Sequence, residues 1–377
     1  MSTQDEELLI GPVNPPEQFD EPELSFDIEI DNFIRAKIAR TAFGVSGRGL
    51  TVAVLDTGLN VKHVDFAGRI PTTRNFTNDD GGDQENASDG NGHGTNVAGL
   101  IVANADHTGI APDAQVIPLK VLPSQGRGSF NWITEALTWI DENHETHSIS
   151  AVCMSLGDSR NYTDDTFPSG FKANIRKQIA DLADKNIAVC IAAGNDFFPH
   201  NSQQGMSFPA IIRECISVGA VYDAEEGEFG YGNGAKAFTT AAGQITPFSQ
   251  RLHSSTNFRT FTDIFAPGAP ATSSGINGIH GESTQHGTSQ ATPVTAGVVL
   301  LMQEFYKRLT GELPPIHLLT TCLRRGGVSI YDGDDENDNV VNTKKYYKHL
   351  DALSALDAVR RYVQKHRLRQ AVKASRE

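Results

Sequence analysis

The 377-residue sequence has few cysteines and no long apolar run. Its four cysteines, Cys153, Cys190, Cys215 and Cys322, show no CxxC or other metal-ligand spacing. The first three lie within short apolar runs typical of strands. We interpret them as small buried hydrophobic residues of a reduced, intracellular protein. No apolar run reaches the roughly 18 residues that a membrane-spanning helix needs.

The N-terminal segment lacks positive charge. Through Ile34 it contains ten carboxylates, four prolines and no Lys or Arg. It has neither the basic nor the long apolar part of a secretory signal, so we expect no signal peptide and a cytoplasmic location. Residues 1–40 are predicted to form an acidic, proline-containing arm. This arm is either a loosely docked or disordered tail, or a short propeptide that folds over a cleft.

Basic residues are also too few to balance the acidic ones over the whole chain. The formal net charge of −14 argues against nucleic acid or an anionic membrane surface as the main partner. The C-terminal tail, residues 361–377, is a basic exception that could pair with the acidic arm. The acidic stretch from Asp332 to Asp338 lacks the spacing of an EF-hand loop, so we expect a solvated hairpin tip there rather than a metal site.

Strand-like apolar runs alternate with amphipathic segments between residues 41 and 360, the predicted main domain. Strands are predicted over 51–55, 115–122, 149–155, 187–193, 215–220 and 262–266. Helices are predicted over 97–103, 132–143, 171–185 and 350–363, and from Ser289 onward with Pro293 in the first turn. This alternation predicts an α/β fold: one doubly wound, mainly parallel sheet with helices on both faces.

Four polar residues are predicted to lie at one edge of this sheet. Asp56 ends the first strand, His93 opens a helix, Asn195 follows another strand, and Ser289 stands at the start of the longest helix. Singly, each has a structural explanation, as a turn former, a helix cap or a strand terminator. Together they supply a serine nucleophile, a base, a carboxylate to orient that base, and a donor for a developing oxyanion.

Four sequence blocks carry a family resemblance. Asp-Thr-Gly at 56–58, His-Gly-Thr at 93–95, Ala-Ala-Gly-Asn at 192–195 and Gly-Thr-Ser-x-Ala-Thr-Pro at 287–293 resemble the subtilisin-type serine proteases (subtilases, peptidase S8). The resemblance runs from about residue 41 to 359 and implies the three-layer α/β/α fold of that family. It implies a serine endopeptidase that cleaves extended or unfolded polypeptides through an acyl-enzyme.

The resemblance also implies a role for each site residue. Ser289 would be the nucleophile, His93 the general base and acid, and Asp56 its orienter, while the Asn195 side chain and the Ser289 N–H would form the oxyanion hole. Two segments resemble the edge strands that pair with substrate backbone: Gly126, Arg127 and Gly128, and Ser155, Leu156 and Gly157. Small residues would line the first specificity pocket and give a broad, mostly apolar preference: Ala192, Ala193, Gly194 and Ser207.

Within the family, residues 75–82 and 89–93 look closest to the intracellular subtilisins, which carry a short N-terminal propeptide. Leu8–Pro12 is similar to the apolar-plus-proline element by which that propeptide blocks the site. Asn96, Gln290 and Val294 depart from the family pattern without touching the triad.

The loop from Asn104 to Gly109 is shorter than the calcium-binding loop of many subtilases. Asp65 matches a calcium ligand whose partners are missing, so we expect no tight calcium site and no required cofactor, although weaker calcium sites stay compatible with the sequence. Polypeptide substrates are the expected partners, and a homodimer is compatible with the sequence. Two other functions stay open: a peptide transamidase or ligase on the same scaffold, and a non-catalytic pseudoprotease that binds peptides.

Overall fold

The computed structural model describes residues 7–9, 26–125, 127–333 and 337–374. Within these ranges nine strands form one sheet, in the order β14-β15-β11-β8-β7-β6-β2-β4-β3. All neighbouring pairs are parallel except β14 and β15. The strands are β2 (Thr51–Asp56), β3 (Arg74–Asn75), β4 (Gln115–Lys120), β6 (Ile149–Met154), β7 (Ala188–Ala192), β8 (Ile216–Val221), β11 (Ile264–Pro267), β14 (Val328–Tyr331) and β15 (Tyr346–His349).

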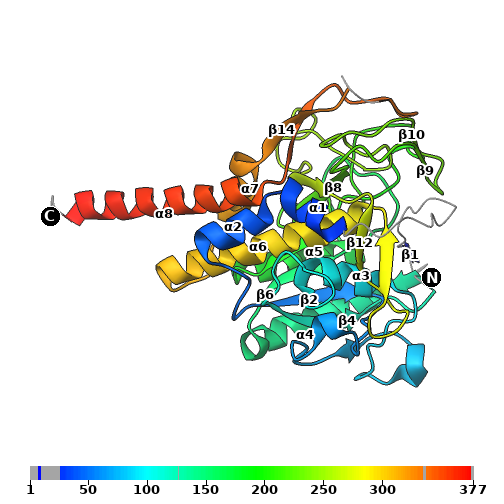
Figure 1. Ribbon diagram of the computed structural model, residues 1–377, viewed down its shortest axis with the longest axis horizontal. Coiled ribbons are helices and arrows are strands. Elements are labelled where there is room, and N and C mark those ends of the chain that lie inside the picture. The colour runs from blue at the N-terminus through cyan, green and yellow to red at the C-terminus, as the bar shows by residue number, and fades with distance from the viewer. Residues whose placement is uncertain (1–6, 10–25, 126, 334–336, 375–377) are drawn as a thin grey trace.

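Alternate residues of a strand point to opposite sides of the sheet, so the apolar strands give it two apolar faces. Helices cover both of these faces. One core contains Val52 and Val54 of β2 and the helices α3 (His93–Val102) and α6 (Thr288–Thr310). The other contains Ala53 and Leu55 of the same strand and the helices α4 (Phe130–His147) and α5 (Gly170–Asp184). The predicted doubly wound α/β/α architecture is therefore confirmed (Figure 1).

The helix that carries Ser289 begins differently from the prediction. Pro293 is the sixth residue of α6, beyond the first turn. A proline there has no N–H for the carbonyl oxygen of Ser289, four residues earlier. The Ser155 hydroxyl instead donates to that oxygen at 2.7 Å. A side chain from the end of β6 thus replaces the missing helical hydrogen bond beside the candidate nucleophile.

The folded body begins earlier than the predicted boundary at residue 41. Helices α1 (Phe26–Phe33) and α2 (Ala36–Phe43) precede β2, and Ile30, Ile34, Ala36 and Ala39 are buried in the main core. Burial of these apolar side chains outweighs the acidic composition around them. Residues 26–40 therefore belong to the catalytic domain, and 10–25 lie outside the described residues.

At the C-terminal end, α7 (Ile316–Gly326), β14 and β15 lead into α8 (Ala352–Ala374). The predicted tail at 361–377 continues this helix through Ala374, and Figure 1 shows α8 extending away from the body. Asp332, predicted in a solvated tip, is instead fully buried and forms an ion pair with buried Arg251 at 3.0 Å. Within the described ranges, no helix is both long and apolar enough to cross a bilayer.

Candidate active site

Asp56 and His93 form a buried pair at the carboxyl edge of the sheet. Asp56 is the last residue of β2, and His93 is the first residue of α3, with Gly92 (φ 99°) before it. The His93 Nδ1 atom lies 2.7 Å from Asp56 Oδ1, and both side chains are almost fully buried. The Gly94 backbone makes this approach possible, because a Cβ there would lie 2.3 Å from the carbonyl oxygen of Gly58.

The electrostatic setting of His93 favours its protonated form. Burial by itself lowers the pKa of His93, but the charge and hydrogen bond of Asp56, with a further contribution from Asp89, outweigh this and raise the pKa. Among the described residues, His93 Nε2 has no hydrogen-bond partner. The pair can therefore hold a proton taken up at Nε2 and stabilise the resulting imidazolium.

Asp89 is a site residue that the sequence reasoning missed. Its Oδ1 accepts hydrogen bonds from the Thr57 hydroxyl and the backbone N–H groups of Asn91 and Gly92, at 2.9 Å each. Its Oδ2 accepts from the N–H and hydroxyl of Thr95. Asp89 thus fixes the turn that leads into His93. Its position four residues before a histidine that opens a helix was the available signal.

Ser289 is the second residue of α6 and is 3% exposed. Its hydroxyl donates to the carbonyl oxygen of Ser155 at 3.3 Å, so it is not hydrogen-bonded to His93 in this rotamer. The starts of α3 and α6 are in contact, since Gln290 Nε2 donates to Asn96 Oδ1 at 3.3 Å. The start of the helix that carries Ser289 therefore lies against the helix that begins at His93. Catalytic hydrogen bonds commonly form only in the substrate complex.

Asn195 follows β7 and is held against the start of α6. The N–H and hydroxyl of Thr288 both donate to Asn195 Oδ1 at 2.9 Å. Because these bonds occupy the oxygen side of the amide, they turn the NH₂ side toward the Gly287–Ser289 backbone. Nδ2 lies 3.3 Å from the position that a Cβ on Gly287 would occupy. Asn195 therefore presents a donor beside the Ser289 N–H, as an oxyanion hole requires.

The structure brings together the residues expected to line the first specificity pocket. The Ser207 N–H donates to the Ala193 carbonyl oxygen at 2.9 Å, and the Ser207 hydroxyl approaches the Ala192 carbonyl oxygen at 3.5 Å. A Cβ on Gly157 would lie 2.6 Å from Ser207 Oγ, and one on Gly194 would lie 3.1 Å from Ser207 Cβ. Ser207 therefore stands between the two glycine-containing walls, and Leu156 is buried in the core beside them.

The predicted substrate-binding segment at 126–128 overlaps a short strand, β5 (Arg127–Ser129). It pairs antiparallel with β1 (Glu7–Leu9), with Leu8 opposite Gly128. Gly126 lies outside the described residues. A piece of the N-terminal arm thus occupies the backbone groups that were expected to bind substrate.

Two of the departures from the family pattern, Asn96 and Gln290, form a polar contact between α3 and α6. Gln290 Nε2 donates to Gln285 Oε1 at 3.2 Å as well as to Asn96, and Asn96 Nδ2 donates to the Ser283 carbonyl oxygen at 2.8 Å. Gln290 Oε1 has no partner among the described residues. The buried Gln290 amide therefore has hydrogen-bond partners on its NH₂ side.

The residues around Asp65 do not fit calcium. Asp65 Oδ1 accepts from the N–H groups of Ala105 and His107 at 3.1 and 3.0 Å. Its Oδ2 accepts from the Ser274 hydroxyl at 2.6 Å and lies 2.7 Å from His107 Nδ1. Calcium takes about six to eight oxygen ligands, whereas the loop here turns N–H groups and an imidazole toward the carboxylate.

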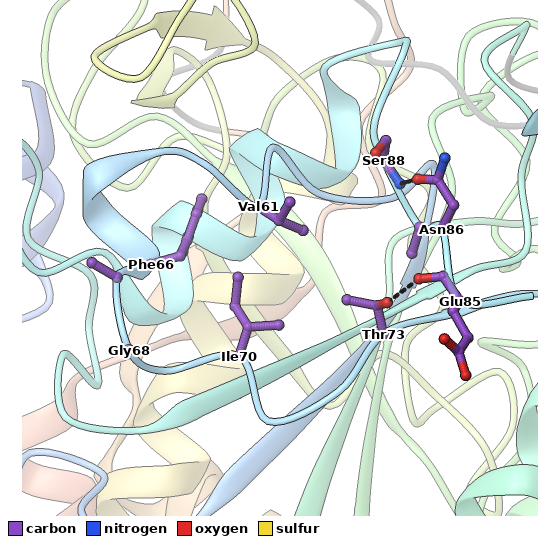
Figure 2. A pocket seen from close by; sticks show the side chains of 10 residues that line it. Val61, Phe66, Gly68, Ile70, Thr73, Glu85, Asn86 and Ser88 are labelled. Carbon is purple, nitrogen blue, oxygen red and sulfur yellow. Dashed lines mark hydrogen bonds between the residues drawn. The ribbon is translucent and has the colours of Figure 1, made fainter.

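A surface pocket of about 370 Å³ is lined in part by Phe66, the residue after Asp65 (Figure 2). Val61, Phe66 and Ile70 form its apolar side, and the Thr73 hydroxyl donates to the Glu85 carbonyl oxygen at its rim. Its lining supplies no nucleophile–base pair.

Comparison with known proteins agrees with this geometry. The sequence pattern of the subtilase family (Peptidase_S8) matches residues 47–344. The chain is 34% identical over 262 residues to an intracellular serine protease of Paenibacillus polymyxa, covering 68% of each chain. It is 31% identical over 268 residues to the major intracellular serine protease of Bacillus subtilis, covering 70% of this chain and 71% of the relative. The chain therefore belongs to the subtilase family, the peptidase S8 family of subtilisin-like serine endopeptidases.

Proposed function

We propose that this protein hydrolyses peptide bonds through an Asp56–His93–Ser289 triad and an acyl-enzyme. The observation that carries the proposal is the buried 2.7 Å contact between Asp56 Oδ1 and His93 Nδ1 beside the start of the helix that bears Ser289. This contact fixes the tautomer in which Nε2 is the basic nitrogen.

In the proposed reaction, Ser289 Oγ attacks the scissile carbonyl carbon while His93 Nε2 takes the hydroxyl proton. The negative charge that develops on the carbonyl oxygen is stabilised by Asn195 Nδ2 and the Ser289 N–H. His93 then gives its proton to the leaving amine, which leaves an ester on Ser289. Water, activated by His93, attacks that ester and regenerates the hydroxyl.

Extended or unfolded polypeptides are the proposed substrates. Once β1 is displaced, the edge of β5 and the segment Ser155–Gly157 would pair with substrate backbone, which requires an extended chain. Small residues on the pocket walls, such as Ala192 and Gly194, favour a broad and mostly apolar preference at the residue before the cleaved bond. Both bacterial relatives are intracellular serine proteases, which favours a role inside the cell.

The N-terminal arm is proposed to inhibit the enzyme. The support is the pairing of Glu7–Leu9 with Arg127–Ser129, which uses the same backbone groups that substrate would use. A tethered segment competes at a high effective concentration, so it would block the cleft until it is displaced or cleaved.

Cleavage of casein by the purified protein tests the proposed chemistry. Wild type is expected to cleave casein and to lose activity with a serine-directed phosphonate, and Ser289→Ala is expected to lose several orders of magnitude in rate with an unchanged fold. Undiminished cleavage by Ser289→Ala would refute the assignment. Addition of a peptide amine separates hydrolysis from transamidation, because a ligase would yield joined products. Peptide binding by wild type without any turnover would indicate the pseudoprotease.

A further inference from the structure

Two histidines and a carboxylate gather at the far end of α3 from the active site. We call His63, Asp65 and His107 the histidine–aspartate cluster; one ligand atom from each lies within 4.8 Å of the others. The side chains of His63 and Asp65 are fully buried and that of His107 is 9% exposed. His63 and Asp65 lie in or beside the short turn η1 (Val64–Phe66), the same turn that supplies Phe66 to the pocket in Figure 2.

The protonation state of His63 follows from its hydrogen bonds. His63 Nε2 lies 2.8 Å from the Gly281 carbonyl oxygen, which can only accept, so Nε2 carries the hydrogen. His63 Nδ1 accepts from the Asp65 N–H at 3.1 Å and is therefore an acceptor. The same nitrogen lies only 3.3 Å from Asp65 Oδ2, a second acceptor. Two acceptors this close repel each other unless a cation lies between them.

His107 raises the same conflict. Its Nδ1 lies 2.7 Å from Asp65 Oδ2, and its Nε2 lies 3.1 Å from Glu282 Oε2. A neutral imidazole carries only one N–H, so with one proton it would turn a lone pair toward one of these carboxylates. Asp65 Oδ2 also accepts a hydrogen bond from the Ser274 hydroxyl at 2.6 Å. A positive charge beside this carboxylate, either a second proton on His107 or a bound metal ion, would remove the conflict.

We propose that His63 Nδ1, Asp65 Oδ2 and His107 Nδ1 bind one Zn²⁺ ion. Imidazole and carboxylate ligands suit zinc, and a water molecule as the fourth ligand would complete a four-coordinate site. The nitrogens turned away from the cluster already donate, or are placed to donate, to the Gly281 carbonyl and the Glu282 carboxylate. Histidines that bind metals are oriented by such outer contacts.

Two of the three ligand separations fit a tetrahedral site after a small movement. With metal–ligand bonds of about 2.0–2.1 Å, two ligands of a tetrahedron lie about 3.3 Å apart. The separation of His63 Nδ1 and Asp65 Oδ2 has this value, whereas the 2.7 Å contact of His107 with Asp65 would open by about 0.6 Å. Zinc would also displace the Asp65 N–H from His63 Nδ1.

A metal at this position would tie together three segments that support the catalytic residues. The turn at His63–Asp65 follows β2, and the loop at 103–109 follows α3. Gly281 lies directly before β13 (Glu282–Gln285), which begins at Glu282 and precedes α6. The expected role is to stabilise the fold, since the cluster lies away from the reacting atoms.

The test uses full-length Ser289→Ala protein, so that autolysis does not interfere. After treatment with a chelator and dialysis, Zn²⁺ is added and bound metal is measured by mass spectrometry; Co²⁺ reports coordination through its visible spectrum. The expected results are one Zn²⁺ per chain, a four-coordinate Co²⁺ spectrum and a melting temperature raised by zinc. An excess of Ca²⁺ is expected not to displace Zn²⁺, because the ligands are mainly imidazoles.

Two variants and a control locate the ion. His63→Gln and His107→Gln are each expected to weaken zinc binding at least tenfold. His280→Gln removes an exposed, neighbouring histidine that contacts Asp106 and not the cluster, and it is expected to bind zinc as before. Circular dichroism checks that each variant is folded. Absence of stoichiometric zinc on the folded parent protein would overturn the proposal and assign the extra charge to a proton. Equal zinc binding by folded His63→Gln and His280→Gln would also overturn it.

Discussion

The hydrogen bond from Ser155 to the Ser289 carbonyl oxygen gives a prediction that combines fold and site. Pro293 removes the helical donor for this oxygen, and the Ser155 hydroxyl supplies a bond of 2.7 Å in its place. In Ser155→Ala the buried oxygen loses this partner. A buried polar group left without a partner costs about 1–3 kcal/mol, so the free energy of unfolding is expected to fall by that amount.

The second perturbation is Pro293→Ala, which restores an N–H in the right place to bond the same oxygen. In that background, Ser155→Ala is expected to cost less than about 1 kcal/mol, which makes the two changes coupled by about 1–2 kcal/mol. Urea unfolding of the four proteins, all with Ser289→Ala to prevent autolysis, measures this cycle. A cost of Ser155→Ala that is the same in both backgrounds, within about 0.5 kcal/mol, would refute the reasoning.

Three further predictions concern the arm, pH and oxidation. Deletion of residues 1–25, which leaves α1 and α2 in place, is expected to raise the initial rate on a peptide substrate, because β5 is then free; an unchanged or lower rate would indicate a structural role. The value of kcat/KM is expected to rise with pH through the pKa of His93, which lies above the ordinary value of 6.5, because the base must be neutral; a flat profile down to acid unfolding would contradict this. Peroxide is expected to spare wild type and to inactivate Gln290→Met under the same dose, since a thioether beside Ser289 oxidises and an amide does not; equal loss in both proteins would mean that another residue controls oxidation.

The central features of the fold were predictable from the sequence because they are local patterns. Apolar runs such as 51–55 and the amphipathic period of 132–143 predict the strands and helices whose two sets of side chains form the two cores. These elements also predict where the site residues lie, because parallel strands bring their carboxyl ends to one edge of the sheet. The residues are Asp56, His93, Asn195 and Ser289. The sequence blocks then connect them to a family.

The features that the sequence did not predict depend on contacts between distant segments. Ile30 and Ile34 are four residues apart, a spacing typical of one helix face, and both are buried. The carboxylates around them led instead to the prediction of an arm outside the core. The position of Asp332 depends on Arg251, which lies 81 residues earlier in the chain. His107 lies 42 residues after Asp65 and reaches it only because the loop after α3 folds back. Composition and periodicity carry no information on such pairs.

The most direct test of the central claim is the position of a serine-directed phosphonate adduct. Protein from which residues 1–25 have been deleted is treated with the reagent and digested, and the adduct is mapped by mass spectrometry. The triad predicts one adduct on Ser289, which forms much more slowly in His93→Ala because the base that activates the hydroxyl is lost. Labelling of another serine, or labelling of Ser289 at the same rate in His93→Ala, would contradict the proposed mechanism.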